Sequence, residues 1–288
     1  AGVFDLAGAA LAVADASGRI GWANAAFRAL HRVPVLDSFL VHREEGSLSA
    51  PAVVFLHGNP TSSRVWRDVL PRLASRSRCL APDLIGMGES GRPDIAYRFG
   101  DHARYLDAWF DALGLRDVVL VGYDWGGVLA LDRAARHPDR VRGVVVFETF
   151  LRPMRWAEWP PQGAALFRAY RTPGVGEAMV LERDEFLANS FAHGVRRGLT
   201  AAERAVYDAA FPTPASRRPV LQWPRELPID GEPADVTATI AGFADAFART
   251  TTPLLLLTFG EQGLGSPAVV DWARAAWPTL EVAALPPA

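Results

Sequence analysis

The sequence contains a single cysteine, Cys79, and lacks long basic runs and long apolar runs. One cysteine excludes an internal disulfide, and its strand-like setting favours a buried, unreactive thiol in a reducing compartment. No segment approaches the roughly eighteen continuous apolar residues that a membrane-spanning helix needs. The formal net charge is −2, so we expect no nucleic-acid or membrane partner and predict a cytoplasmic protein.

Apolar residues are abundant and form 50% of the 288 positions. This is enough for one large α/β domain, or for one domain with an insertion. Apolar runs alternate with helical patterns, which predicts a mostly parallel sheet with helices on both faces. We expect strands at 35–41, 52–56, 79–81, 118–121, 144–147, 253–259 and 280–285, and helices at 64–73, 100–113, 238–249 and 270–276.

The pattern divides the chain into four regions. Residues 1–32 contain two strand-like segments followed by a helical pattern at 25–30, and they resemble the start of a PAS sensor domain. This part is too short to form a ligand pocket, so we interpret it as a remnant or an extension. Between 153 and 233 the strands stop and aromatic residues and proline accumulate. We interpret that region as a helical cap inserted between two parts of the core, 33–152 and 234–288.

The apolar run 118–121 leads into Gly122-Tyr123-Asp124-Trp125-Gly126-Gly127, and a helical pattern begins at once. Small residues on both sides of one side chain are what a sharp strand-to-helix turn requires. This pattern predicts a nucleophile elbow that carries Asp124. The alternative is that Asp124 caps the N-terminus of the following helix.

Three polar residues fall at the carboxyl ends of predicted strands: Asn59, Asp124 and Glu148. The carboxyl ends of parallel strands meet at one edge of a sheet, where ligands bind in open α/β folds. We therefore expect these side chains to converge. Their convergence favours the elbow interpretation of Asp124 over the helix cap.

A carboxylate at an elbow can attack saturated carbon and form an ester. The indole N–H of Trp125 and the side-chain amide of Asn59 are neutral donors that would stabilise a departing halide in a dry pocket. Alternatively, Trp125 packs the elbow and Asn59 caps a turn. A departing alkoxide would instead need a proton, normally from a tyrosine of the cap.

Six segments in the core and the cap have the pattern of one known family: His57-Gly58-Asn59-Pro60 with the three residues after it, Ala81-Pro82-Asp83-Leu84 with 85–88, residues 101–109, Asp124-Trp125-Gly126, Trp156-Ala157-Glu158-Trp159-Pro160, and Trp223-Pro224-Arg225-Glu226 with 227–229. On these segments the chain, from Val35 onward, resembles the haloalkane dehalogenases of the α/β-hydrolase superfamily. The resemblance is to the subfamily that also includes Renilla luciferase.

The resemblance implies roles for particular residues. Asp124 is expected to be the nucleophile, Asn59 and Trp125 the halide-binding pair, and Glu148 the acid that orients a catalytic histidine. Glu261 is the alternative acid. The residues expected to line the substrate pocket are Phe167, Phe186, Leu227 and Leu264. The expected partners are a small hydrophobic halogenated substrate, halide ion and water. No cofactor and no metal are expected, and we predict a monomer.

The chain departs from the family pattern at two places. Tyr123 stands before the nucleophile where the family usually has histidine. The catalytic histidine of the family follows a turn after the last strand, where this sequence has Pro286-Pro287-Ala288. The six histidines all precede Gly194, and of these only His193 is a candidate base. We therefore expect a truncated C-terminal part without the histidine loop and last helix, in which Asp124 is alkylated but the ester is not hydrolysed at a useful rate.

Three other functions remain open. An epoxide hydrolase shares the elbow but needs cap tyrosines to protonate the opened oxygen, and Tyr170 and Tyr207 are the candidates. The same scaffold could support a coelenterazine-type luciferase or monooxygenase. The PAS-like start and the missing base would also fit a catalytically incomplete binding module.

Overall fold

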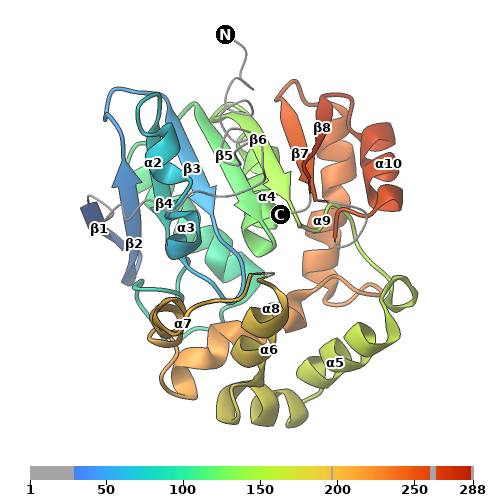
Figure 1. The fold of residues 1–288 in the computed structure, drawn as a ribbon. Coiled ribbons are helices and arrows are strands. Elements are labelled where there is room, and N and C mark those ends of the chain that lie inside the picture. The colour runs from blue at the N-terminus through green and yellow to red at the C-terminus, as the bar shows by residue number, and fades with distance from the viewer. Residues whose placement is uncertain (1–28, 196, 260–263, 287–288) are drawn as a thin grey trace.

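The computed structural model describes residues 29–195, 197–259 and 264–286. Its centre is an eight-stranded, mostly parallel sheet in the order β1-β2-β4-β3-β5-β6-β7-β8 (Figure 1). The strands are β1 Ala29–Val35, β2 Ser38–Glu45, β3 Ala52–Leu56, β4 Arg78–Pro82, β5 Val118–Tyr123, β6 Val141–Phe147, β7 Leu254–Thr258 and β8 Leu280–Ala284. The predicted parallel sheet is thus confirmed from β4 to β8.

The edge of the sheet differs from the prediction of a single strand over 35–41. β1 and β2 form an antiparallel hairpin with a turn at Leu36 and Asp37, and Leu36 has φ 50°. The prediction was wrong because alternation continues across a two-residue turn, and leucine at positive φ gives no turn signal. Leu30, predicted as helical, lies in β1, so the boundary predicted after residue 32 falls inside this strand. The rest of the PAS-like segment lies outside the described residues.

Successive side chains of the strands enter two apolar layers, one on each face of the sheet. Val54 and Leu120 belong to the layer that also includes buried residues of α3 Phe99–Ala112, α4 Trp125–Arg136, α9 Ala234–Ala248 and α10 Pro267–Ala276. Val53 and Val119 belong to the other layer, with Trp66. The helix predicted at 64–73 is there two short elements, η1 Ser63–Trp66 and α2 Leu70–Leu73.

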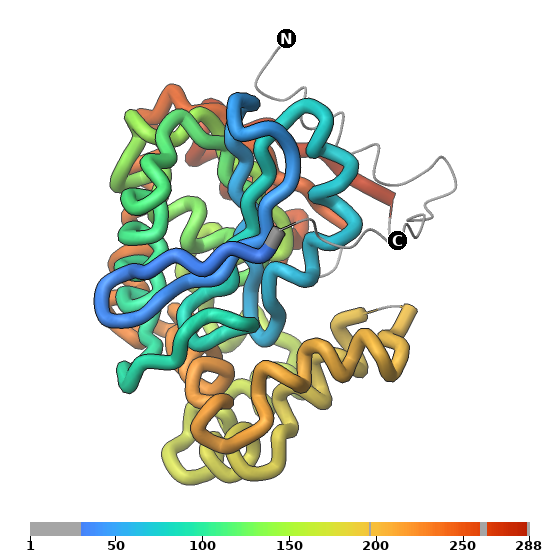
Figure 2. Tube along the Cα trace, turned by 90° about the vertical axis from the view of Figure 1, so that its left-hand side faces the viewer, coloured from blue at the N-terminus to red at the C-terminus, as the bar shows by residue number. Residues whose placement is uncertain are grey.

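The region between β6 and α9 contains no strand among its described residues and forms the cap. Figures 1 and 2 show its helices gathered at one end of the sheet. No helix in the described ranges is long and apolar enough to cross a membrane. The cap elements are η2 Trp156–Glu158, α5 Pro161–Arg171, η3 Glu177–Glu182, α6 Glu185–His193, α7 Ala201–Asp208, η4 Ala215–Arg217 and α8 Arg218–Glu226.

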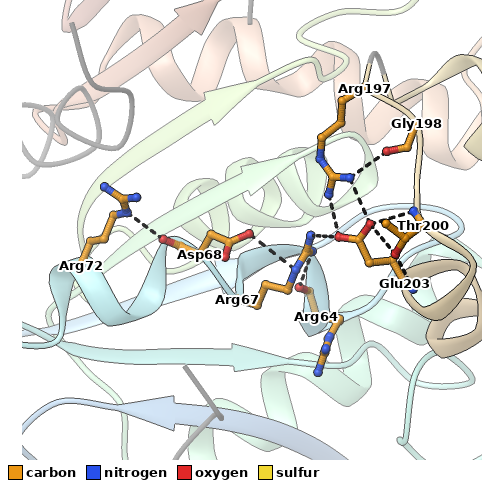
Figure 3. A network of polar contacts seen from close by, with 8 residues as sticks. All are labelled: Arg64, Arg67, Asp68, Arg72, Arg197, Gly198, Thr200 and Glu203. Carbon is orange, nitrogen blue, oxygen red and sulfur yellow. Dashed lines mark hydrogen bonds and ion pairs between the residues drawn. The ribbon is translucent and has the colours of Figure 1, made fainter. Parts of the chain in front are cut away.

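Ion pairs centred on Glu203 join the cap to the core (Figure 3). Arg67, next to η1, donates to the Glu203 carboxylate at 3.0 Å, and Arg197 donates to both carboxylate oxygens at 2.7 and 3.0 Å. The same carboxylate accepts the N–H of Thr200, which closes the capping box of α7. The hydrogen bonds from Arg197, together with those from Thr200, lower the pKa of Glu203 to about 2.

We predict that Glu203→Gln lowers the free energy of unfolding by about 1 kcal/mol at pH 7. A carboxyl group with a lowered folded-state pKa stabilises the fold above its ordinary pKa of 4.5, and this contribution is lost as the pH falls toward 2. The difference between variant and parent should therefore shrink below pH 4.5 in urea unfolding. Glu89→Gln, which removes an exposed carboxylate paired with Arg43, is the control. Equal losses in both variants would contradict the prediction.

Candidate functional site

Asp124 lies at a sharp turn between β5 and α4, with φ 49° and ψ −132°. Such a backbone is strained for a residue with a side chain, and it persists only where neighbours hold it. The N–H of Asp124 donates to the carbonyl oxygen of Glu148 at 2.8 Å, and the Thr149 hydroxyl donates to the Asp124 carbonyl oxygen at 2.6 Å. The end of β6 therefore holds the turn in place.

Glycines around Asp124 permit backbone contacts that a side chain would block. A Cβ atom on Gly126 would lie 2.2 Å from the carbonyl oxygen of Leu56, and one on Gly58 would lie 2.4 Å from Oδ2 of Asp124. Both distances are far below ordinary contact. The glycine pattern that predicted an elbow thus marks places where the strand, the helix and the loop after β3 meet.

The carboxylate of Asp124 makes no capping bond to α4 within the described part of the chain, so the helix-cap alternative is not supported. Its Oδ2 instead accepts the backbone N–H of Asn59 at 2.8 Å. Burial raises the pKa of Asp124 to about 7, while the N–H groups of Asn59 and Trp125 oppose that rise. The site therefore holds a poorly solvated carboxylate with one oxygen fixed by a peptide donor.

The two predicted halide donors lie next to Asp124: Trp125 follows it in the chain, and Asn59 contacts it through the backbone N–H. The side-chain Nδ2 of Asn59 donates to the carbonyl oxygen of Val220 in α8 at 3.1 Å, and its Oδ1 is buried with no hydrogen-bond partner among the described residues. The indole of Trp125 is 2% exposed and stacks on Trp223 of the cap at 4.5 Å between ring centroids. Both residues thus contact the cap, and no pattern in the sequence predicted these contacts.

Glu148 lies next to Asp124 because its backbone carbonyl oxygen accepts the N–H of Asp124. Its carboxylate accepts the N–H of Leu264 at 3.1 Å, so the loop after β7 lies against it. Leu264, which was expected to line the substrate pocket, contacts Glu148 through its backbone N–H. The alternative acid, Glu261, lies outside the described residues.

The predicted pocket residues of the cap lie in two places. The rings of Phe167 and Phe186 contact each other edge to face at 6.4 Å, and both contact Tyr170. Leu227 is buried directly after α8, where its carbonyl oxygen accepts a bond from Arg171 at 2.7 Å. Phe186 and Leu227 belong to the apolar layer that contains Trp125, and Phe167 packs against that layer.

Two histidines, His57 beside Gly58 and His193 in the cap, have environments other than that of a base. Nε2 of His57 accepts the N–H of Leu84 at 3.0 Å, so its proton is on Nδ1, which donates to the carbonyl oxygen of Gly58 at 2.9 Å. His57 is therefore committed to the backbone. His193, the candidate base of the cap, is exposed at the end of α6. Neither has the setting of a general base.

One group of described residues has the side chains that a metal ion would need: His31, His42 and Glu44, on the paired strands β1 and β2. Glu44 is already paired with Arg78 at 2.6 Å, and the indole N–H of Trp109 points at Nδ1 of His42. A metal on Nε2 would put the imidazole proton on Nδ1, facing that indole donor. The cluster therefore fits a hydrogen-bonded sheet edge better than a metal site.

Comparisons with known proteins agree with this geometry. A family model for the alpha/beta hydrolase fold matches residues 51–230. A haloalkane dehalogenase from Mesorhizobium japonicum is 52% identical over 235 residues, 81% of this chain and 75% of that protein. One from Bradyrhizobium diazoefficiens is 49% identical over 246 residues, 81% of this chain and 79% of that protein. The crystal structure of haloalkane dehalogenase DbeA from Bradyrhizobium elkani has a TM-score of 0.86 and 45% identity, covering 90% of each chain.

The eight-stranded sheet and the strand-to-helix turn at Asp124 define the class as an α/β hydrolase. Within this class, two relatives that are about half identical to this chain over four-fifths of its length are haloalkane dehalogenases. The chain belongs to the haloalkane dehalogenase family.

We predict that Gly126→Ala lowers the free energy of unfolding by about 1–3 kcal/mol, because the new methyl group collides with the backbone of β3. Gly242→Ala is the matched control, since Gly242 is exposed in the middle of α9 with no atom within 4 Å of its Cβ position. That variant should gain up to about 1 kcal/mol from helix propensity. Urea unfolding of the two variants measures both effects, and a tolerated Gly126→Ala would contradict the packing described for the elbow.

We predict that Asp124→Asn makes the protein more stable at pH 8 and leaves its stability unchanged near pH 4. A carboxyl group whose folded-state pKa rises from 3.8 to about 7 binds more protons when folded, so stability falls as the pH rises through that window. At about 1.4 kcal/mol per pKa unit, the gain at pH 8 is on the order of 2–4 kcal/mol. Exposed Asp139→Asn is the control and should be neutral at both pH values. A gain that does not depend on pH would refute the assignment.

Proposed function

We propose that this chain is a haloalkane dehalogenase in which Asp124 displaces halide from carbon. The observation that carries the proposal is the carboxylate at the elbow, which is partly withdrawn from water and has one oxygen held by the N–H of Asn59. A charge that is poorly solvated before the reaction and dispersed in the transition state favours displacement. The haloalkane dehalogenases among the relatives support the same reaction.

The first step is a displacement in line with the carbon–halogen bond. Because Oδ2 is held by Asn59, Oδ1 is the oxygen that attacks. A carbon–oxygen bond forms, the carbon–halogen bond breaks, and its electron pair leaves with the halide. The indole N–H of Trp125 and the amide of Asn59 would stabilise the halide, and for this the amide must turn away from the carbonyl oxygen of Val220.

The second step is hydrolysis of the ester. A water molecule attacks the carbonyl carbon of the ester, and the charge that develops on Oδ2 is stabilised by the same N–H of Asn59. The bond between that carbon and Oδ1 then breaks, Oδ1 leaves in the alcohol, which takes up a proton, and the oxygen of the water completes the carboxylate of Asp124. The water must lose a proton to a base, which in this family is a histidine oriented by an acid, here Glu148. The histidines of the sequence are His31, His42, His57, His102, His137 and His193. His57 is committed to the backbone, His193 is exposed at the end of α6, and the carboxylate of Glu148 is bonded to the N–H of Leu264 and to no histidine of the described residues, so we expect the 288-residue chain to stop at the ester.

The substrate class follows from the residues proposed for the pocket. Phe167, Phe186, Leu227 and Leu264 carry no polar group in their side chains, so they select a small hydrophobic substrate. The halogen is recognised by the two neutral donors, and no cofactor is required by the displacement. We expect the chain to act as a monomer.

We predict that incubation with 1-bromohexane adds one hexyl group to the protein, located by peptide mapping on the peptide that contains Asp124. Intact-protein mass spectrometry measures the gain, and the adduct should persist because no base removes it. Asn59→Ala should slow its formation about a hundredfold, which is the usual cost of removing one donor from a developing anion.

Two variants serve as controls. Asp124→Asn should take up no hexyl group, whereas Asp132→Asn, at a buried aspartate of the same helix, should be alkylated like the parent. Steady turnover of 1-bromohexane would contradict the arrest at the ester. An unchanged mass in folded protein would refute the proposed function. Epoxide opening, light emission with coelenterazine, or reversible ligand binding alone would then identify which of the alternatives applies.

A further inference from the structure

The hydroxyl group of Tyr123 lies beneath the loop that holds the nucleophile. Tyr123 is the last residue of β5, and its ring stacks on Phe147 at 5.6 Å with an angle of 13° and meets Trp66 edge to face. The hydroxyl lies 2.5 Å from Oγ1 of Thr61. Two aromatic contacts therefore fix the ring, and its polar end reaches the loop after β3.

The direction of these hydrogen bonds is determined by counting protons. The hydroxyl of Thr61 has a single hydrogen, which it donates to the carbonyl oxygen of Gly58 at 3.0 Å. It must therefore accept the hydrogen of Tyr123. The chain of bonds runs one way, from Tyr123 through Thr61 to Gly58.

The carbonyl oxygen of Gly58 is the most heavily bonded atom of this loop. Besides the Thr61 hydroxyl, it accepts the backbone N–H of Thr61 at 3.0 Å and Nδ1–H of His57 at 2.9 Å. The carbonyl group of Gly58 and the N–H of Asn59 belong to one planar peptide unit, and they point in opposite directions. Holding the oxygen at one end consequently aims the N–H at the other end, toward Oδ2 of Asp124 at 2.8 Å.

We infer that Tyr123 is a positioning residue for the nucleophile: through Thr61 it fixes the peptide between Gly58 and Asn59, and so it aims the N–H that holds Asp124. This inference rests on the proposed displacement of halide by Asp124. Tyr123 does not touch the reacting atoms. Although Tyr123 directly precedes Asp124 in the chain, it acts on Asp124 through hydrogen bonds to the loop after β3, which in turn contacts the carboxylate.

Two consequences follow for Asp124 when the Tyr123 hydroxyl is removed. The N–H of Asn59 is aimed less well, so the carboxylate attacks from a poorer geometry and the alkylation rate falls about three- to tenfold. The same loss weakens a bond to the charged form, so the pKa of Asp124 rises further and the alkylation rate reaches its half-maximum at a higher pH. Loss of stability alone would not move that midpoint.

The groups that titrate near Tyr123 are Asp124 on its own turn and Tyr207 on the cap helix α7. Burial raises the pKa values of both tyrosines, so neither loses its proton between pH 5 and 9. His57 is buried, with a pKa below its ordinary value, and stays neutral over most of this range. We therefore expect the alkylation rate of the parent protein to reach its half-maximum near pH 7 and to report the titration of Asp124.

The experiment measures single-turnover alkylation by 1-bromohexane from pH 5 to 9, using quenched samples and intact-protein mass spectrometry. The parent 288-residue chain is compared with Tyr123→Phe, Thr61→Val, the double variant and Thr61→Ser. Tyr97→Phe is the control, because its buried hydroxyl also donates to a backbone carbonyl oxygen, that of Pro93, in another loop.

We expect Tyr123→Phe and Thr61→Val to lower the rate and to shift the midpoint to higher pH by the same amount. The double variant should be no worse than either single one, because both changes break the same path. Thr61→Ser keeps the hydroxyl and should restore the rate, and Tyr97→Phe should match the parent.

Two results would overturn the inference. One is alkylation of Tyr123→Phe with the rate and midpoint of the parent. The other is a double variant whose losses add. If Tyr123→Phe does not fold, Thr61→Val decides alone, since the path requires both hydroxyls. Absence of an adduct on the parent chain would reject the proposed function and, with it, the inference. An adduct on the parent together with unchanged kinetics in Tyr123→Phe would reject the inference alone.

Discussion

The backbone at Asp124, bent to φ 49° between β5 and α4, is the constraint on which the rest of the site depends. It turns the carboxylate away from the helix and toward the loop after β3, where a peptide N–H meets it. Three close approaches make this possible, at Gly122, Gly126 and Gly58, each of which would be blocked by a Cβ atom. Burial then raises the pKa of Asp124, and the same N–H groups limit that rise.

The cap is attached to the core by contacts of two kinds. Near the site, Trp223 stacks between Trp125 and His102, and the amide of Asn59 bonds to the backbone of α8. At the periphery, arginine side chains form ion pairs with carboxylates across the boundary between core and cap, as Arg67 does with Glu203. The chain has no lysine, and the planar guanidinium allows one group to serve several acceptors. The apolar contacts thus determine where the cap lies over Asp124, while the ion pairs hold its outer helices.

Much of the fold was predictable because buried strands carry a strong signal. The apolar run at 118–121 falls in β5, and the run at 253–259 contains β7. The alternation of such runs with helical patterns predicted a mostly parallel sheet but not the order of its strands. The hairpin of β1 and β2 was not predicted, because its turn residues continue the alternation of the strands. The predicted helix at 64–73 is interrupted at 67–69, where Pro71 near the start of α2 offers no bond to the preceding turn.

The sequence by itself determined which side chains lie at the carboxyl ends of the strands, and therefore that Asp124, Asn59 and Glu148 converge at one edge of the sheet. Only the tertiary structure decided what each of them contacts. Asn59 bonds to a carbonyl oxygen 161 residues away, and Glu148 to an N–H 116 residues away. Every residue has the same carbonyl group, and every residue except proline has the same N–H, so the sequence does not indicate which backbone group a side chain will bond to. The path from Tyr123 through Thr61 to Gly58 was hidden for a related reason, because it exists only where β3 and β5 pair side by side.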